Sequence, residues 1–435
     1  MQTNFLNHLQ KRILITLGFL AIYRIGVHIP IPGVDTVALR QFFASQGGNL
    51  LSMFNMFSGG ALERFSVFAL GVMPYISASI ISQLLTVVVP KLEALSKEGQ
   101  SGRKKITQYT RYGTIFLAVI QGFMIARTLQ SADFNGSPLV TQGGLGWMLL
   151  TVLSLVAGTA FVMWLGEQIT DRGVGNGISL IIFAGIVAGL PSVLGNTYSQ
   201  YTSEQLDLLR ILIIVAVCIF VVAGVVFMET GARQVPIQYT KRQMGQKVFS
   251  GQQSHLPLRV NASGVIPPIF ASSLLQFPLT VAAFSPQSPL AEIINTYMIP
   301  GGWLYNTVYV IGVVFFAFFY TKIVFKTDDV AENLKKNGGF IPGIRPGIRT
   351  AEYLDQLVDR LTMSGAIYLA AICVLPTILT GQFNVQFYFG GTSLLIVVGV
   401  ALDTFRQIEG HRQSLRYEAF MKSSKNSKRR RVPVR

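Results

Sequence analysis

Apolar stretches that are free of charged residues, apart from Arg24 in the first, recur along the chain and are separated by polar segments. They lie at residues 13–32, 69–90, 112–126, 146–165, 177–196, 211–228, 261–284, 303–321, 363–382 and 388–402. A helix needs about 20 mostly apolar residues to cross a bilayer. The pattern therefore predicts an all-α polytopic membrane protein with ten transmembrane helices and both termini on one side.

Three polar segments on the side of the termini are longer than a connection requires. Residues 229–260 alternate polar and apolar positions on both sides of SGQQS, which predicts a β-hairpin. Residues 322–362 contain NGGFIPGIRPG, which forbids a helix, and then the amphipathic TAEYLDQLVDRL. The tail from Arg406 onward ends in KSSKNSKRRRVPVR, which is too polar to fold alone.

A further segment, NMFSGGALERFSVF at residues 55–68, is too short and too charged to cross the membrane. Gly59 and Gly60 precede about three helical turns that carry Glu63 and Arg64. This pattern predicts a re-entrant or interfacial helix, whose non-helical backbone would line protein or a water-filled cavity. An amphipathic surface loop is the alternative.

The composition agrees with a membrane protein. Hydrophobic residues make up 50% of the chain, charged residues 13%, and the mean hydropathy is +0.47. A soluble globular protein is about 25% charged, so an ordinary soluble enzyme is excluded. The first span follows Lys11 and Arg12 and resembles a signal peptide, but no small-residue cleavage site follows it, so we expect a retained helix.

The net charge of +16 is distributed unevenly over the two sides. Of 36 Lys and Arg residues, 31 lie on the side of the termini and one, Arg24, lies inside a span. The other side receives Arg40, Arg64, Arg127 and Arg210. Because basic loops stay cytoplasmic, this asymmetry predicts cytoplasmic N- and C-termini.

The sequence lacks the usual signatures of catalysis. Cys218 and Cys373 lie in separate apolar runs, which supports neither a disulfide nor a zinc site. Neither GxxxxGK[ST] nor HExxH occurs, and serines inside the spans have no candidate base beside them. We therefore expect no enzyme and no cofactor. A proton-coupled transporter is disfavoured because Arg24 is the one charged residue inside a span.

The two halves of the chain show an internal repeat. Residues 71–83 match residues 264–276 at seven of thirteen positions, and residues 177–185 match residues 391–399 at five of nine. A repeat of five spans must be inverted in the membrane, around an axis in the bilayer plane. The predicted domains are residues 1–208 with five spans, residues 209–408 with five spans, and a basic tail at residues 409–435.

The repeat pairs Val72 with Val265, Ile76 with Ile269, and Ile182 with Ile396. Equivalent helices of such halves face each other across a central seam, so the four isoleucines are candidates for that seam. An apolar constriction excludes ions by dewetting and yields to a substrate that forces it apart. The alternative interpretation is ordinary packing of β-branched residues in a helix bundle.

Six motifs follow one another along the chain: FNMFSGGAL, FALGVMPYISASI, SGRKKITQYTRYGT, MWLGEQITDRGVGNGISLIIFAGIVAGLP, NLKKNGGFIPGIRPG and QFYFGGTSLLIVV. In this order they resemble the bacterial SecY family, the channel subunits of the general secretion translocase. The resemblance extends from about Lys11 to Arg406. It implies ten helices in an inverted repeat and a passive channel for secretory polypeptides.

The resemblance also assigns roles to residues. It implies a pore ring of Val72, Ile76, Ile182, Ile269 and Ile396. It implies a plug made of Phe57, Ser58, Gly59, Gly60, Ala61, Leu62, Glu63, Arg64, Phe65, Ser66, Val67 and Phe68. Ser77 and Phe277 would face each other at a lateral gate, through which an apolar signal sequence leaves for lipid.

The partners of the family are expected here as well. Arg242, Lys247 and Arg345 would contact the motor ATPase SecA or the ribosome, whose RNA attracts basic side chains. Gln246 stands where the family usually has one of two adjacent basic residues. The resemblance implies the small subunits SecE and SecG, polypeptides with signal sequences as substrates, and the bacterial cytoplasmic membrane as location. The rival classes are a secondary transporter for a small solute and a scaffold or insertase without a pore.

Overall fold

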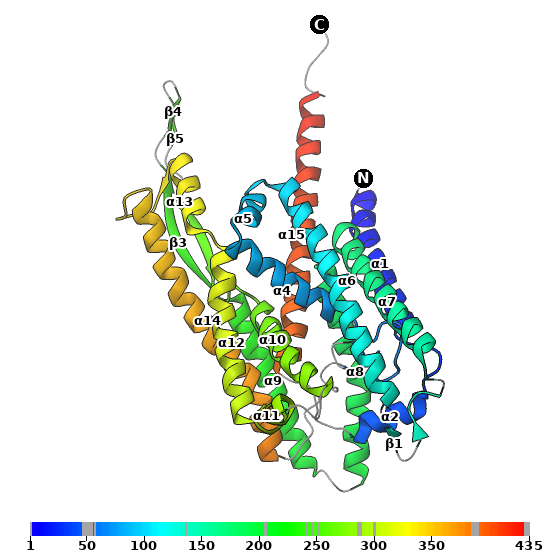
Figure 1. Cartoon of the computed structure of the whole chain (residues 1–435). Coiled ribbons are helices and arrows are strands. Elements are labelled where there is room, and N and C mark those ends of the chain that lie inside the picture. The colour runs from blue at the N-terminus through cyan, green and yellow to red at the C-terminus, as the bar shows by residue number, and fades with distance from the viewer. Residues whose placement is uncertain are drawn as a thin grey trace. The chain divides into compact units, whose positions relative to one another are not determined.

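Figure 1 shows the computed structural model of the chain, which consists mainly of long helices. The structure describes residues 2–45, 55, 58–131, 133–134, 137–141, 143–203, 207–239, 242–244, 247–249, 253–284, 289–298, 302–383 and 391–429. The chain forms two compact units, one of residues 1–196 and 400–435 and the other of residues 197–399. The domain boundaries predicted at residues 208 and 408 stay a prediction.

The first unit is a bundle in which α6 packs against both α4 and α7, and α1 packs against α7. Its elements are α1 (Gln2–Gly26), α2 (Thr36–Ser45), α4 (Met73–Val88), α5 (Pro90–Lys97), α6 (Gln100–Ser131), β1 (Asp133–Phe134), β2 (Ser137–Pro138), α7 (Leu145–Arg172) and α8 (Gly177–Thr202). The helix α15 (Gly391–Arg429) begins in the second unit and ends in the first.

In the second unit α12 packs against both α10 and α14. Its helices are α9 (Leu208–Thr230), α10 (Ile266–Phe284), α11 (Pro289–Tyr297), α12 (Trp303–Val324), α13 (Thr327–Lys336) and α14 (Ile348–Phe383). Its strands are β3 (Ala232–Tyr239), β4 (Arg242–Met244), β5 (Lys247–Phe249), β6 (Gln253–Arg259) and β7 (Gly339–Phe340).

A helix lies at each of the ten predicted spans, namely α1, α4, α6, α7, α8, α9, α10, α12, α14 and α15. Among the described residues, six helices are long and apolar enough to cross a membrane, or seven if α4 and α5 are one bent span. Their apolar side chains face outward, as on α9, where Phe220 and Phe227 are exposed. Such helices need a bilayer as solvent, so the protein is polytopic.

The sharp bend between α4 and α5 has a local cause. The two helices meet at 98°. Pro90 opens α5, and Val89 before it is extended, with φ −99° and ψ 112°. A residue before proline is pushed out of the helical region, so α4 must end there.

The hairpin predicted for residues 229–260 is present. β3 pairs antiparallel with β6 from Ala232 with Arg259 to Gln238 with Gln253. β4 pairs with β5 and places Met244 opposite Lys247. The chain therefore reverses between residues 244 and 247, rather than at SGQQS, and residues 245–246 lie outside the description.

Two segments that are separate in the sequence form one structure, here called the hairpin module: β3 to β7, α13 and the first turns of α14. β7 pairs with β3 at Gln238 and Phe340. The module has an apolar core of its own, made of Val235, Leu258, Ile341, Leu354 and Val358. The amphipathic TAEYLDQLVDRL begins α14, which continues as the ninth predicted span without a break.

Candidate functional site

Residues 58–72, here called the turn segment, form successive turns instead of the predicted helix. Gly59 and Gly60 have φ values of 68° and 84°, and Phe65 has φ 45°. These left-handed positions interrupt a helical hydrogen-bond ladder, which is why the helix prediction is wrong. The surface-loop alternative also fails, because Phe65 and Ser66 are fully buried. Phe57 of the predicted plug lies outside the described residues.

The C-terminal end of α1 anchors the turn segment. The Arg24 guanidinium donates from Nη1 to the Gly59 carbonyl oxygen at 2.9 Å, and the Tyr23 hydroxyl donates to the Ser58 carbonyl oxygen at 3.0 Å. Farther along, the amide of Ile31 donates to the Phe65 carbonyl oxygen at 2.9 Å. Arg24, the charge that the sequence leaves inside a span, therefore satisfies backbone of a segment 35 residues away.

Aromatic rings fix the other side of the segment. Phe68 stacks between Tyr23 and Phe161, with centroid distances of 5.9 Å to each. Phe65 stacks on Trp147 at 6.5 Å. A Cβ added to Gly158 of α7 would collide with the Val67 carbonyl oxygen, so this glycine permits the close approach of helix and segment. Stacked rings of this kind stabilise a contact by about 0.5–1.5 kcal/mol beyond area burial.

The two charged side chains of the turn segment, Glu63 and Arg64, are partly buried. Asn55 and Glu63 bind each other reciprocally: the Asn55 amide donates to Glu63 Oε2 at 3.1 Å, and the Glu63 backbone amide donates to Asn55 Oδ1 at 3.0 Å. Arg64 has its Nη1 atom buried, with no hydrogen-bond partner among the described residues. These contacts hold the polar side of the segment in place.

In the first unit, the predicted ring residues border the turn segment. Val72 ends the segment and precedes α4, and the amide of Ile76 donates to its carbonyl oxygen at 3.0 Å. Val72, Ile76 and Ile182 are all buried. A Cβ added to Gly59 would lie 2.8 Å from the Cα of Gly185, one turn along α8 from Ile182.

The second unit holds the other two ring residues. Ile396 on α15 is buried, and Ile269 on α10 is partly buried. α10 and α15 approach closely, because a Cβ added to Gly399 would meet the Cγ1 atom of Val265 at 2.5 Å. The ring as a whole stays a prediction. So does the lateral gate: Ser77 is half-buried on α4, and Phe277 belongs to α10 with its side chain outside the description.

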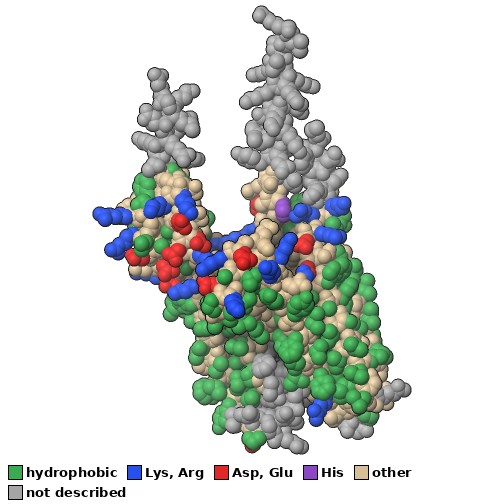
Figure 2. All heavy atoms as spheres, turned by 45° about the horizontal axis from the view of Figure 1, so that its top comes forward, with side chains coloured by type: hydrophobic (Ala, Val, Ile, Leu, Met, Phe, Trp, Pro, Cys, Tyr) green, Lys and Arg blue, Asp and Glu red, His purple; other side chains and the backbone are tan. Residues whose placement is uncertain are grey.

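The predicted contacts for cytosolic partners lie on the hairpin module. Arg242 belongs to β4 and Lys247 to β5, whose side chains are outside the description, as is Gln246. Arg345 is exposed in the loop before α14, and its carbonyl oxygen accepts a hydrogen bond from Thr350. Figure 2 shows basic and acidic side chains gathered together where α13 lies. On α13, the Lys336 ammonium lowers the pKa of the Glu332 carboxyl by a direct hydrogen bond.

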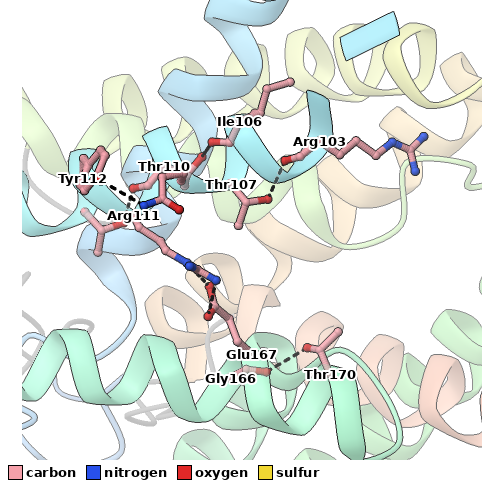
Figure 3. A network of polar contacts seen from close by, with 11 residues as sticks. Arg103, Ile106, Thr107, Thr110, Arg111, Tyr112, Gly166, Glu167 and Thr170 are labelled. Carbon is pink, nitrogen blue, oxygen red and sulfur yellow. Dashed lines mark hydrogen bonds and ion pairs between the residues drawn. The ribbon is translucent and has the colours of Figure 1, made fainter. Parts of the chain in front are cut away.

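Sequence reasoning missed the ion pair between Arg111 of α6 and Glu167 of α7 (Figure 3). The guanidinium donates from Nε and Nη2 to the two carboxylate oxygens, at 2.7 and 2.8 Å. A bidentate pair of this kind is both strong and directional, so it fixes the two helices against each other. Each residue lies just beyond a predicted span, but nothing in the sequence relates two positions 56 residues apart.

Among the described residues, no group of three or more His, Cys, Asp or Glu could hold a metal ion. Helices long and apolar enough to span a bilayer enclose a segment too short to span it, with apolar residues at the contact. This fold and site define a polytopic membrane protein of the channel class. A family model described as SecY matches residues 66–405, more than half of the chain, and the chain belongs to the SecY family.

The chain is similar to known proteins over nearly its whole length. The protein translocase subunit SecY of Escherichia coli K12 is 50% identical over 423 residues, which cover 96% of this chain and 95% of that protein. A SecY structure described by its plug domain has a TM-score of 0.65 at 17% identity, covering 94% and 93% of the two chains. Sec61 in the canine ribosome-channel complex has a TM-score of 0.64 at 16% identity, with the same coverage.

At such low identity the two structures show the fold alone. The family membership rests on the sequence match. As a SecY-family member, the chain is a protein-conducting channel subunit of the Sec translocase and is not an enzyme.

Proposed function

We propose that Val72, Ile76, Ile182, Ile269 and Ile396 form the constriction through which unfolded secretory polypeptides cross the bacterial cytoplasmic membrane. One observation carries the proposal: the turn segment borders two ring residues that are distant in sequence. It ends at Val72, and its Gly59 meets α8 one turn from Ile182. Apolar side chains at such a place exclude ions by dewetting yet part for a chain pushed through them.

The turn segment acts as the plug that seals the resting channel, with Phe57–Phe68 as its predicted extent. The contacts of the segment support this role. Arg24 and Tyr23 donate hydrogen bonds to its backbone, and Phe68 packs between two aromatic rings. The structure of a SecY protein is described by a plug domain that stabilises the closed state and maintains a membrane seal. A segment built of turns can leave as a unit, because its hydrogen bonds are mostly local.

Ser77 on α4 and Phe277 on α10 flank the route by which an apolar segment leaves sideways for lipid. The driving force is the hydrophobic effect, since a signal sequence loses free energy when it moves from water to lipid. Apolar outer faces on the neighbouring helices support this route, as on α6, where Phe116 is exposed. SecE and SecG complete the membrane complex.

SecA or the ribosome drives transport from the cytoplasmic side, where both termini and the hairpin module lie. Arg242, Lys247 and Arg345 contact these partners. The basic loops support this orientation, and Sec61 is described in a complex with a ribosome. Basic side chains on a protruding loop attract ribosomal RNA in a salt-dependent way. A transporter for a small solute would need buried charge at the repeat interface, which the sequence does not offer there.

Photo-crosslinking of a stalled secretory chain tests the polypeptide path. Probes replace Ile76 and Ile269 in turn, and the control probe replaces Phe220, which is 79% exposed on the outer face of α9. We expect strong adducts from the two ring positions and none from Phe220. If a demonstrably engaged chain reacts at neither ring position, the ring is ordinary packing and the proposal fails.

Resting conductance tests the seal separately. The double variant Ile182→Gly, Ile396→Gly removes one buried ring side chain from each repeat. It should leak ions in the absence of a substrate. The matched control Leu194→Gly, Phe405→Gly removes exposed side chains from the same two helices, and its resting conductance should equal that of the unchanged protein. Equal conductance of both variants would contradict the ring.

A further inference from the structure

A buried polar contact lies where the hairpin module joins the membrane helices. α9 leads into β3 through Gly231 alone, and β6 leads into α10 through residues 260–265. The amide of Val260 donates to the Gly231 carbonyl oxygen at 3.0 Å, so the two strands are tied at their base. Each end of the hairpin is therefore joined to a helix by a short connection, of one residue at α9 and six residues at α10.

Glu229, one residue before the end of α9, is buried beside this base. Burial of a carboxylate is costly, and the C-terminal end of a helix adds an unfavourable dipole. Asn261 compensates: its Nδ2 atom donates to Glu229 Oε1 at 2.6 Å. A carboxylate kept in such a place needs a function to explain it.

Asn261 also organises the connection to α10. Its Nδ2 atom donates to the Gly264 carbonyl oxygen at 3.0 Å, and its Oδ1 atom accepts from the Ser263 hydroxyl at 3.0 Å. Asn261 and Ser263 are each 4% exposed. The Asn261 side chain thus links the end of α9 to Ser263 and Gly264 of the connection.

The connection is confined on its other side as well. α14 passes so close that a Cβ added to Gly365 would lie 3.0 Å from the Val260 carbonyl oxygen. At the far end, Val265 packs against Gly399 of α15, one turn from Ile396. The first turn of α10 then carries Ile269. Because the connection is packed on both sides, a movement of the hairpin base should displace the backbone next to Ile269 and Ile396.

We infer that the Glu229–Asn261 hydrogen bond is a rigid joint that transmits load from the hairpin module to the start of α10. Asn261 is a positioning residue that acts on Ile269 through the backbone of residues 261–266. The inference rests on the proposed function, because it takes the hairpin as the partner contact and Ile269 as part of the ring. It adds the link by which binding of a partner outside the membrane reaches the constriction.

The joint can be tested by its rigidity, independently of transport. Spin labels on Ser254 of β6 and Leu274 of α10, both exposed, report the angle between hairpin and helix in the full chain in lipid nanodiscs. Cys218 and Cys373 are replaced by alanine in the background. The unchanged joint should give a narrow distance distribution. Asn261→Leu should broaden it, whereas the exposed control Ala262→Ser should not.

Transport supplies the second readout. Asn261→Leu should lower SecA-driven transport about tenfold, in line with the loss of a hydrogen bond to a buried charged group, while its affinity for SecA stays unchanged. If Asn261→Leu does not fold, Asn261→Gln displaces the same amide by one methylene and should give the same changes to a smaller degree.

A distance distribution as narrow in the Asn261 variant as in the unchanged protein would overturn the joint. Broadening with normal transport would overturn the transmission of load. Failure of the ring is seen separately, in the crosslinking experiment at Ile76 and Ile269, which leaves the distance measurement valid.

Discussion

The turn segment and the hairpin formed by β3 to β6 occupy equivalent places in the predicted repeat, between its first and second spans in each half, yet they fold in opposite ways. The turn segment is buried among the helices of its unit, with Phe65 fully inaccessible. The hairpin continues past the helices that hold it (Figure 1). Together with α13 and the start of α14 it builds a separate core around Leu354. One connection is packed into the interior of its unit, and the other is built as a protruding structure.

The difference follows from how each segment satisfies its backbone. In the turn segment, most amides bond locally, as from Ser66 to Ala61. Arg24 of α1 and the residues that follow α1, Ile29 and Ile31, supply bonds from outside the segment. In the hairpin, the ladder between β3 and β6 pairs residues in register from Ala232 to Gln238. Polar backbone at membrane depth must be enclosed by protein, whereas a paired ribbon can extend into water.

The largest effect is expected from Phe65→Ala in the turn segment. Removing a fully buried phenylalanine should lower the free energy of unfolding by about 3–5 kcal/mol. Thermal unfolding of the purified protein measures it. Phe220→Ala, which truncates an exposed ring on α9, is the matched control and should change the melting temperature little. Similar losses from both variants would show that the turn segment is not part of the core.

The corresponding test of the hairpin module is Leu354→Ala. Leu354 is fully buried in the core of the module, so its truncation should cost about 2–5 kcal/mol. Because that core belongs to the module alone, limited proteolysis should cut within residues 231–260 faster, while the helices stay protected. Met363→Ala, at a half-exposed position on the same helix, should leave the cleavage rate unchanged. Equal protection in both variants would contradict an independent core.

Arg24→Leu should have an intermediate effect. It removes the donor to the Gly59 carbonyl oxygen, and the loss of a hydrogen bond to a charged group costs about 1.5–3 kcal/mol. Ion conductance of the resting channel should rise, since the turn segment is held less firmly. Ile25→Leu, at an exposed neighbouring position, should conduct as the unchanged protein does. A tight seal in Arg24→Leu would show that this anchor is dispensable.

The smallest loss of stability is expected from alanine substitutions at two adjacent glycines, Gly59 and Gly60, which should differ from each other. Gly60→Ala places a side chain in open space, so it should cost only the strain of a left-handed residue, about 1–2 kcal/mol. Gly59→Ala adds the same strain and also drives its Cβ against the backbone of Gly185. Its melting temperature should therefore fall further. The reverse order would mean that contact with α8 does not confine the segment.

The helix prediction for the turn segment failed for a reason visible in particular residues. ALERFSVF has good helix formers, but propensity is a weak guide when tertiary contacts compete. Phe65 takes a left-handed conformation because its ring packs on Trp147 and its carbonyl oxygen accepts from Ile31. Neither partner is close to it in the sequence, so local reasoning could not weigh them.

The sequence by itself determined the apolar spans, the hairpin and the membership of the SecY family, because periodicity, charge and motifs are local properties of the chain. Tertiary structure alone decided that Arg24 holds Gly59, that Arg111 pairs with Glu167 and that Asn261 caps Glu229. These contacts join residues between 32 and 56 positions apart. They exist because buried polar groups must find partners, and only the packed helices determine which partners are within reach.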